Sequence, residues 1–400
     1  MDSLHGVVSR ARRWTWRLSV SALVIATCPH ASAQQPAPQP SPAPPPTSAD
    51  WTQKIKLSGF IQAQFVSNEN SETGVDAQGR PLNAHRFEIR RGRLKLTYTD
   101  GPAEGVLHID ATNTGIKLLE AEVSGKIKWQ GDAYTKLTAG LFRIPFGYEL
   151  QESTSTLPWP ERSIWANRMF PGVRDIGARV WGAAWGEKLV YQLALQNGHP
   201  IGEASFPGLD PNGFKDVTGR LGTKVGPLRA GVSGLIGRGY LAPAEDDAAT
   251  PEDESHDAGG YSRWAAGADL VLTFDVAPLG ELGLYSEAVY AKNLDRSNAK
   301  NLPKRVVDAD GDATDEVEDA NHLGAYVGAQ QHLGKLFALG ARYDYFDPDT
   351  DADDDQISAV TFVAHAFPAD SLRLTVAYEL RVEKPQVDDN QLWLRAQVKY

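Results

Sequence analysis

Apolar and polar residues alternate along most of the chain after residue 50. The last ten residues, QLWLRAQVKY (391–400), place an apolar side chain at nearly every second position and end on Tyr400. The segments SLRLTVAYELRV (371–382) and KIKLSGFIQAQF (54–65) have the same period, with Gly59 in the apolar series. A period of two predicts strands with one apolar and one polar face. An aromatic residue that ends such a strand is typical of an outer-membrane barrel, and a soluble edge strand is the alternative.

Sixteen stretches of the sequence have the character of strands, and their usual length of about ten residues is what a tilted membrane strand needs. We therefore expect an all-β fold, an antiparallel transmembrane β-barrel of about 16 strands of the outer-membrane porin type, with fourteen or eighteen strands as alternatives. The expected strands are 54–66, 84–98, 103–112, 117–129, 134–144, 174–185, 189–196, 214–224, 228–237, 262–276, 280–292, 321–332, 335–346, 356–367, 371–382 and 391–400.

Tight turns alternate with longer connections between these strands. The tight turns are rich in Gly, Pro and Asp, as in TDGP (99–102) and PADS (368–371). Odd-numbered connections are long and even-numbered connections are tight. This alternation predicts an even-stranded barrel with both termini on the periplasmic side of the outer membrane of a Gram-negative bacterium. Aromatic residues beside the tight turns are expected to form a girdle at that membrane interface. They are Tyr98, Trp129, Tyr134, Phe274, Tyr285 and Tyr400.

The first fifty residues differ from the remainder in composition. Four arginines precede an apolar core at 18–27 and an Ala-Ser-Ala site at 31–33, so residues 1–33 are predicted to be a signal peptide. A lipoprotein signal that uses Cys28 is the alternative. Residues 34–50 are a Pro-rich flexible linker, and residues 51–400 are expected to be the transmembrane β-barrel porin domain. Cys28 is the only cysteine, which excludes a disulfide scaffold in the exported chain.

Acidic residues are concentrated in three expected outer loops, although the formal net charge of the whole chain is -11. The segments 241–260, 308–319 and 347–355 contain many acids and no Lys or Arg, which leaves the rest of the exported chain net basic. Several basic side chains alternate with apolar ones in the expected strands, and they are Arg93, Lys95, Arg342, Arg373 and Arg395. A charge that faced lipid at mid-depth would cost about 2–4 kcal/mol, so these side chains should face a water-filled lumen.

Rings of Arg and Lys in a lumen favour anions or phosphate. The alternative for each residue is that it solvates the lumen and pairs with a nearby acid, such as Asp110, Glu122, Asp344 or Glu379.

The loop DADGDATDEVED (308–319) resembles part of a calcium-binding loop. Asp308, Asp310 and Asp312 occupy its first, third and fifth positions, and Asp319 occupies the twelfth, but the usual glycine is absent and no helices flank the loop. We expect no cofactor other than a weak external Ca²⁺ ion at these four aspartates, and a solvated acidic loop, bridged to lipopolysaccharide by divalent ions, is the alternative.

Several motifs resemble those of the phosphate-selective porin O/P family. They are FEIRRGRLKLTY (87–98), AGLFRIPFGYELQESTST (139–156), PERS (160–163), VRDIGARVWG (173–182) and YQLALQNG (191–198). The resemblance covers residues 54–200 and the terminal strand. It implies a sixteen-stranded homotrimeric channel for passive uptake of phosphate, polyphosphate or related anions, with a third loop that folds into the lumen.

The third loop corresponds to residues 145–173. Its arginines, together with those near its entry and on the second strand, are the candidates for the pore constriction. They are Arg90, Arg91, Arg93, Arg143, Arg162, Arg168 and Arg174. The planar guanidinium group suits this role because it binds phosphate oxygens bidentately and stays charged. Alanine at Arg93 or Arg143 is therefore expected to lower anion preference without unfolding the barrel.

We predict that the protein is an outer-membrane porin for small anions. A measurement of ion selectivity tests this prediction. The alternatives are a general or cation-preferring porin, and a structural or adhesive barrel with acidic surface loops. An enzyme is not expected, because the sequence has no GxSxG, no HExxH and no tight Ser/His/Asp cluster. The expected partners are phosphate or other small anions, outer-membrane lipid and lipopolysaccharide, and the barrel-assembly machinery through the strand that ends at Tyr400. Nothing in the sequence predicts a nucleic-acid partner.

Overall fold

The computed structural model describes residues 52–69, 84–199, 210, 213–241, 259–296, 302–307, 313–383 and 389–400. The predicted signal peptide and Pro-rich linker lie outside these residues. Within the described residues, no helix is long and apolar enough to cross a membrane.

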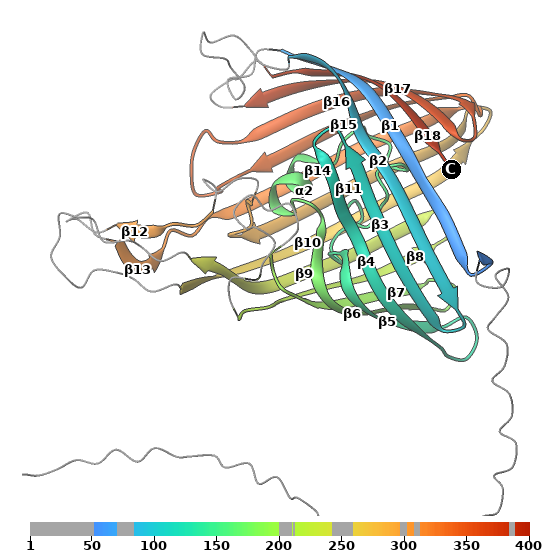
Figure 1. Ribbon diagram of the computed structural model, residues 1–400. Coiled ribbons are helices and arrows are strands. Elements are labelled where there is room, and N and C mark those ends of the chain that lie inside the picture. Colours follow the sequence, from blue (N-terminus) through green and yellow to red (C-terminus); the bar gives the residue numbers. More distant parts are fainter. Residues whose placement is uncertain are drawn as a thin grey trace, which may run out of the picture. The chain divides into compact units, whose positions relative to one another are not determined.

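Sixteen antiparallel strands form one closed barrel (Figure 1), which confirms the fold class that the alternation predicts. Each strand pairs with its neighbour in sequence, and β11 pairs with β14. The strands are β1 (Ile55–Asn68), β2 (His85–Asp100), β3 (Ala103–Thr112), β4 (Gly115–Lys128), β5 (Tyr134–Arg143), β6 (Arg174–Ala184), β7 (Leu189–Gln196), β8 (Asp216–Val225), β9 (Leu228–Leu241), β10 (Gly259–Val276), β11 (Gly280–Lys292), β14 (Asn321–Leu333), β15 (Phe337–Asp347), β16 (Ile357–Ala369), β17 (Leu372–Glu383) and β18 (Gln391–Lys399).

The predicted strands agree with these bounds to within a few residues. The largest difference is at β9, which continues to Leu241 instead of ending at 237. Two elements were not expected from the sequence. A short helix α2 (Ile164–Met169) lies in the third loop, and the hairpin β12 (Arg305–Val307) and β13 (Ala313–Val317) forms a separate two-stranded sheet between β11 and β14. Local alternation is too short in these segments to reveal them.

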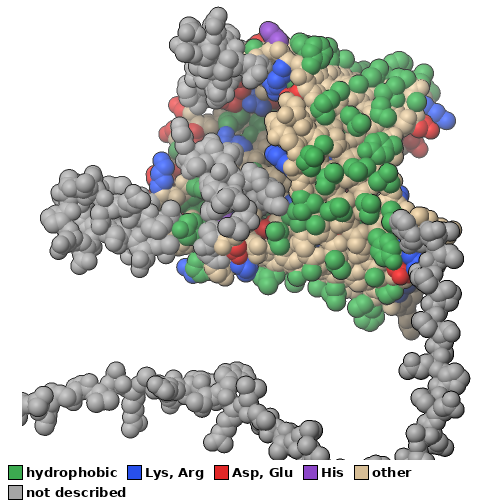
Figure 2. All heavy atoms as spheres, in the orientation of Figure 1, with side chains coloured by type: hydrophobic (Ala, Val, Ile, Leu, Met, Phe, Trp, Pro, Cys, Tyr) green, Lys and Arg blue, Asp and Glu red, His purple; other side chains and the backbone are tan. Residues whose placement is uncertain are grey.

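The two faces of the barrel wall follow the alternation in the sequence. On β17, Leu374, Val376 and Leu380 point outward and are 42%, 52% and 41% exposed, whereas Thr375 and Glu379 point inward and are buried. Figure 2 shows apolar side chains spread over the outer wall. Of the expected girdle residues, Trp129, Phe274 and Tyr400 are exposed at the end of the barrel that carries the tight turns. Tyr285 instead points inward, where it packs against residues of the third loop.

The chain closes the barrel where β1 meets β18. Phe60 pairs with Lys399, and the backbone N–H groups of Gly59 and Tyr400 each donate to the other residue's carbonyl at 3.0 Å. The Tyr400 hydroxyl also donates to the carbonyl oxygen of Arg93 at 3.1 Å. The aromatic residue at the end of the chain therefore joins both strands that flank β1.

Gly59 lies under the Tyr400 ring, where a Cβ atom would overlap the Arg93 carbonyl oxygen and the ring. We expect Gly59→Ala to destabilise the folded barrel by about 1–3 kcal/mol, because the added methyl group forces the closing strands apart. Urea unfolding in detergent, followed by tryptophan fluorescence, measures this. Gly105→Ala on β3 is the control, since nothing lies within 4 Å of its Cβ position. Equal unfolding midpoints for the two variants would contradict the prediction.

Candidate channel lumen

The third loop, residues 144–173, fills part of the barrel interior (Figure 1) and has a hydrophobic core of its own. Phe146, Trp165 and Phe170 pack together at ring-centroid distances of 4.9–6.4 Å and are nearly fully buried. They pack against inward side chains of the wall, including Val289 and Tyr326. The loop is therefore held by burial of apolar side chains as well as by polar contacts.

Small residues in the wall make room for two tryptophans of this loop. A Cβ atom at Gly324 would overlap Trp165, and one at Gly328 would overlap Trp159. Trp159 also belongs to a second cluster that includes Val363 and Trp393. The sequence analysis did not single out either glycine, because their contact with an indole ring joins β14 to a distant loop.

The beginning of the third loop is fixed to the wall by a carboxylate that the sequence analysis missed. Glu287 on β11 accepts hydrogen bonds from the backbone N–H groups of Tyr148 and Glu149, each at 2.8 Å, and from the Tyr326 hydroxyl at 2.8 Å. Gly147 precedes them with φ of 59°, and a side chain there would overlap Glu287. The role of Glu287 is visible only in the contact between β11 and the segment PFGYE (145–149), which is distant in sequence. No local sequence signal marks this residue.

An irregularity in β2 brings two consecutive arginines into the lumen. The pairing between β1 and β2 shifts between Gln62 and Ala63, so that Gln62 faces Arg91 and Ala63 faces Ile89. Such a β-bulge adds one residue to a strand and turns its side chain. Strict alternation would place Arg90 and Arg91 on opposite faces, but both contact Glu161 of the third loop.

Glu161 is bound by three arginines from two strands. Its carboxylate accepts hydrogen bonds from Arg90 at 2.8 and 2.9 Å, from Arg91 at 2.7 Å and from Arg395 on β18 at 2.7 Å. Burial alone would raise the pKa of Glu161, but the three guanidinium charges outweigh it and hold that pKa well below its usual range. We call Arg90, Arg91, Arg395 and Glu161 the Glu161 cluster; its three cations outnumber its one anion.

A second cluster surrounds Glu120 on β4. This carboxylate forms ion pairs with Lys95 at 3.0 Å and with Arg143 and Arg174 at 3.1 Å each, and it lies 3.2 Å from His108. Arg143 also donates to the carbonyl of Gln151 in the third loop. Here too three cations of the predicted set share one acid.

The remaining predicted arginines have other partners. Arg93 pairs with Asp110 at 3.0 Å, Arg342 pairs with Asp344 at 2.6 Å, and Arg168 pairs with Asp295. Arg162 donates to two carbonyls of its own loop, and Arg373 donates to the carbonyl of Leu157 and to Gln397. The structure thus places all eleven predicted residues inside the barrel, divided among several groups. Their role in ion binding stays a prediction.

The predicted pairing with acids holds for several of these residues. Arg93 meets Asp110 and Arg342 meets Asp344, as the alternative interpretation proposes, while Glu122 pairs with Arg179 and Glu379 with Arg381. The Glu161 and Glu120 clusters are different, because each has more cations than acids.

Two cavities of about 310 Å³ each border the Glu161 cluster near the end of the barrel with the long loops. Both are lined by Arg90, Glu161, Gln391 and Trp393. The first continues to Arg86 and Thr114, and the second to residues of β15 and β17. The ion pair of Arg90 and Glu161 therefore lies between two solvent-sized spaces.

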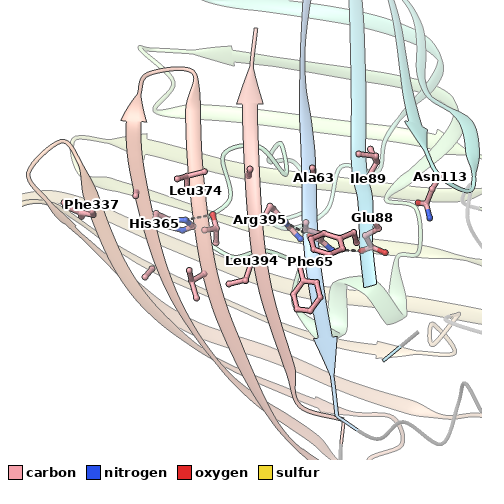
Figure 3. Close-up of a pocket in the computed structure, with 17 residues that line it drawn as sticks. Ala63, Phe65, Glu88, Ile89, Asn113, Phe337, His365, Leu374, Leu394 and Arg395 are labelled. Carbon is pink, nitrogen blue, oxygen red and sulfur yellow. Dashed lines mark hydrogen bonds between the residues drawn. The ribbon is translucent and has the colours of Figure 1, made fainter. Parts of the chain in front are cut away.

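A larger cavity of about 1170 Å³ lies against the outer face of the wall where β16, β17, β18, β1 and β2 meet (Figure 3). Its lining is mostly apolar and includes Phe65, Phe87 and Leu394. Phe87 is 85% exposed, the highest value among the large apolar side chains of the described residues. This groove is part of the apolar belt and separate from the lumen.

The predicted calcium site cannot be described as a whole, because Asp308, Asp310 and Asp312 lie outside the described residues. Asp319 is described, and it pairs with Lys292 at 2.5 Å and accepts a hydrogen bond from Asn293 at 2.7 Å. Within the residues that the structure covers, no group of three or more His, Cys, Asp or Glu side chains could hold a metal ion.

Solved structures of outer-membrane channels and porins are similar to this barrel. The barrel is similar to the outer membrane channel DcaP of Acinetobacter baumannii, with 14% identity, a TM-score of 0.60, and coverage of 86% of this chain and 97% of that one. It is similar to an anion-selective porin from Comamonas acidovorans (14% identity, TM-score 0.55, coverage 86% and 99%) and to Salmonella typhi OmpF (13%, 0.53, 86% and 97%). No family model matches the sequence, and no curated protein matches it. The chain therefore has the fold of an outer-membrane porin.

Proposed function

We propose that this protein is an outer-membrane porin that lets small anions diffuse passively through a water-filled lumen, with phosphate or polyphosphate as the expected solutes. The observation that carries the proposal is the excess of cations at the Glu161 and Glu120 clusters, where six basic side chains share two carboxylates. Rings of basic side chains favour anions in a pore. Three of the six are partly accessible: the side chains of Arg90, Lys95 and Arg143 are 40%, 37% and 17% exposed.

Phosphate as the solute is supported by the chemistry of these groups and by the motif resemblance to the phosphate-selective porin O/P family. Guanidinium groups bind planar or tetrahedral oxyanions through two parallel hydrogen bonds. The similarity of the fold to a porin described as anion-selective agrees with this choice. Passive diffusion requires no chemistry, so we propose no enzymatic activity.

We also propose that the barrel lies in the outer membrane of a Gram-negative bacterium as a homotrimer, with both termini periplasmic. The apolar belt would contact lipid and lipopolysaccharide, and the outer groove around Phe65 and Phe87 is the face we assign to contact between protomers. The terminal strand with Tyr400 is the expected contact for the barrel-assembly machinery.

The sign of the reversal potential across a salt gradient in planar bilayers tests the proposed function. An anion channel gives a potential of the sign set by chloride. The opposite sign would favour the cation-preferring porin that the acidic loops suggest. Absence of stepwise conductance would favour a structural barrel, since the third loop occupies much of the interior.

We expect Arg90→Gln to lower the chloride preference, because Arg90 is the most exposed guanidinium of the Glu161 cluster. A unit charge about 4 Å from an ion contributes about 1 kcal/mol in water, so the permeability ratio should fall roughly five-fold. Lys224→Gln is the control: Lys224 is 59% exposed beside a tight turn, where it pairs with Glu187. A reversal potential that changes equally in both variants would remove Arg90 from the selectivity site.

A further inference from the structure

Glu161 occupies the place that a small oxyanion would take among the arginines. Both of its carboxylate oxygens are used: Oε1 accepts from Arg90, from Arg395 and, at 3.4 Å, from Arg91, and Oε2 accepts from Arg90 and Arg91. The pair with Arg90 is bidentate, which is the geometry that a guanidinium group offers to a free carboxylate or phosphate.

The three arginines keep this carboxylate charged. Hydrogen bonds to groups other than the carboxylate hold two of these arginines in place. Arg91 also donates to Gln62 at 2.9 Å, and Arg395 donates to Gln64 at 2.7 Å and to the carbonyl of Pro160 at 2.6 Å. These bonds do not involve the carboxylate, so the two buried arginines would keep their positions without it. Arg90 is different, since its guanidinium group donates to the two oxygens of Glu161.

Glu161 lies where solutes in the lumen can reach the Glu161 cluster. The Glu161 side chain is 22% exposed, and it borders both cavities of about 310 Å³ together with Arg90. An anion in either cavity therefore reaches the same guanidinium group that Glu161 holds.

We propose that the Glu161 carboxylate competes with permeant oxyanions for the arginines of the Glu161 cluster. This competition limits the anion preference of the channel. An entering carboxylate or phosphate takes over the fork of Arg90 while Glu161 keeps Arg91 and Arg395. Exchange of one oxyanion for another leaves the number of ion pairs nearly unchanged, so binding stays weak enough for passage. This inference rests on the proposed function, because it names the group that tunes that selectivity.

The test compares Glu161→Gln with Glu152→Gln. Both acids lie in the third loop, both are ion-paired at 2.6–2.8 Å, and their side chains are 22% and 24% exposed, but Glu152 pairs with a single arginine, Arg229. In planar bilayers, inorganic phosphate is titrated against chloride current, and the reversal potential is measured for each variant. Since glutamine keeps the shape of the side chain and one acceptor oxygen, the loop should stay attached.

We expect Glu161→Gln to lower the phosphate concentration that halves the chloride current by at least about five-fold, and to shift the reversal potential toward anions. Glu152→Gln should shift both quantities less. Glu161→Asp, which keeps the charge, should behave like the wild type. If Glu161→Asp instead matches Glu161→Gln, the effect belongs to the shape of the loop and the inference is overturned.

Equal responses of Glu161→Gln and Glu152→Gln would also overturn the inference, since any lost lumen charge would then suffice. A different result would contradict the proposed function: a reversal potential of the wild type whose sign indicates cation selectivity. The two failures are therefore distinguishable in the same experiment. The mobility of unheated and heated samples in detergent gels checks that each variant is folded.

Discussion

Replacement of Trp165 with alanine should release the third loop from the wall and increase single-channel conductance. Trp165 is fully buried, packs on Phe146 and Phe170, and fits against Gly324, where no side chain could be accommodated. Truncation of a buried tryptophan costs about 3–5 kcal/mol, which is large for a loop that rests on two such clusters. The barrel wall keeps its strand pairing, so the loss falls on the loop.

The measurement is single-channel conductance in planar bilayers together with limited proteolysis of the third loop. Trp185→Ala is the control, because Trp185 lies in a tight turn and is 69% exposed. We expect the control to leave conductance unchanged. Wild-type conductance and protease resistance in Trp165→Ala would show that the loop is held by its polar contacts, such as those of Glu287, and not by its apolar core.

Arg93→Ala should destabilise the barrel by about 3–5 kcal/mol, because it leaves a buried carboxylate without its cation. The side chains of Arg93 and Asp110 are only 9% and 10% exposed, and Arg93 also donates to Thr154 in the third loop at 3.0 Å. The sequence alone predicts that Arg93→Ala lowers anion preference without unfolding the barrel, and the buried ion pair adds a loss of stability to that prediction. Urea unfolding in detergent measures the change.

A second variant separates the cost of the unpaired charge from the loss of packing. Asp110 accepts the backbone N–H of Gly92 at 2.9 Å, and asparagine can keep that bond without the charge. Asp110→Asn in the Arg93→Ala background should therefore recover part of the lost stability. An Arg93→Ala variant as stable as Lys54→Ala, which removes an exposed ion pair with Asp100, would show that the buried pair contributes little.

The distribution of partners changes which arginines are expected to act on ions. Arg93 and Arg342 each have a buried acid of their own, so their charges are locally neutralised. Arg90 shares Glu161 with two other cations, and Lys95 shares Glu120 with two others. Both side chains remain partly exposed. Selectivity experiments should therefore begin at these two residues.

The strands could be predicted from the sequence because their signal is local. Alternation of Leu374, Thr375 and Val376, with tight turns such as 368–371, follows from a wall that meets an apolar phase on one side and a polar one on the other. The third loop could be located by its length and motifs, and its arginines could be named. Their partners could not, because Glu120 and Glu161 gave no signal that would join them to residues on other strands.

The sequence by itself determined an antiparallel barrel of about sixteen strands with an apolar outer face, and it placed several basic side chains on the inner face, since each depends on residues adjacent in the chain. Only the tertiary structure decided that a bulge turns Arg90 and Arg91 to the same side and that Tyr285 points inward. It also decided that Glu161 lies among three guanidinium groups. These contacts join residues as far apart as 161 and 395, and their geometry is set by barrel closure and loop packing, which no local pattern encodes.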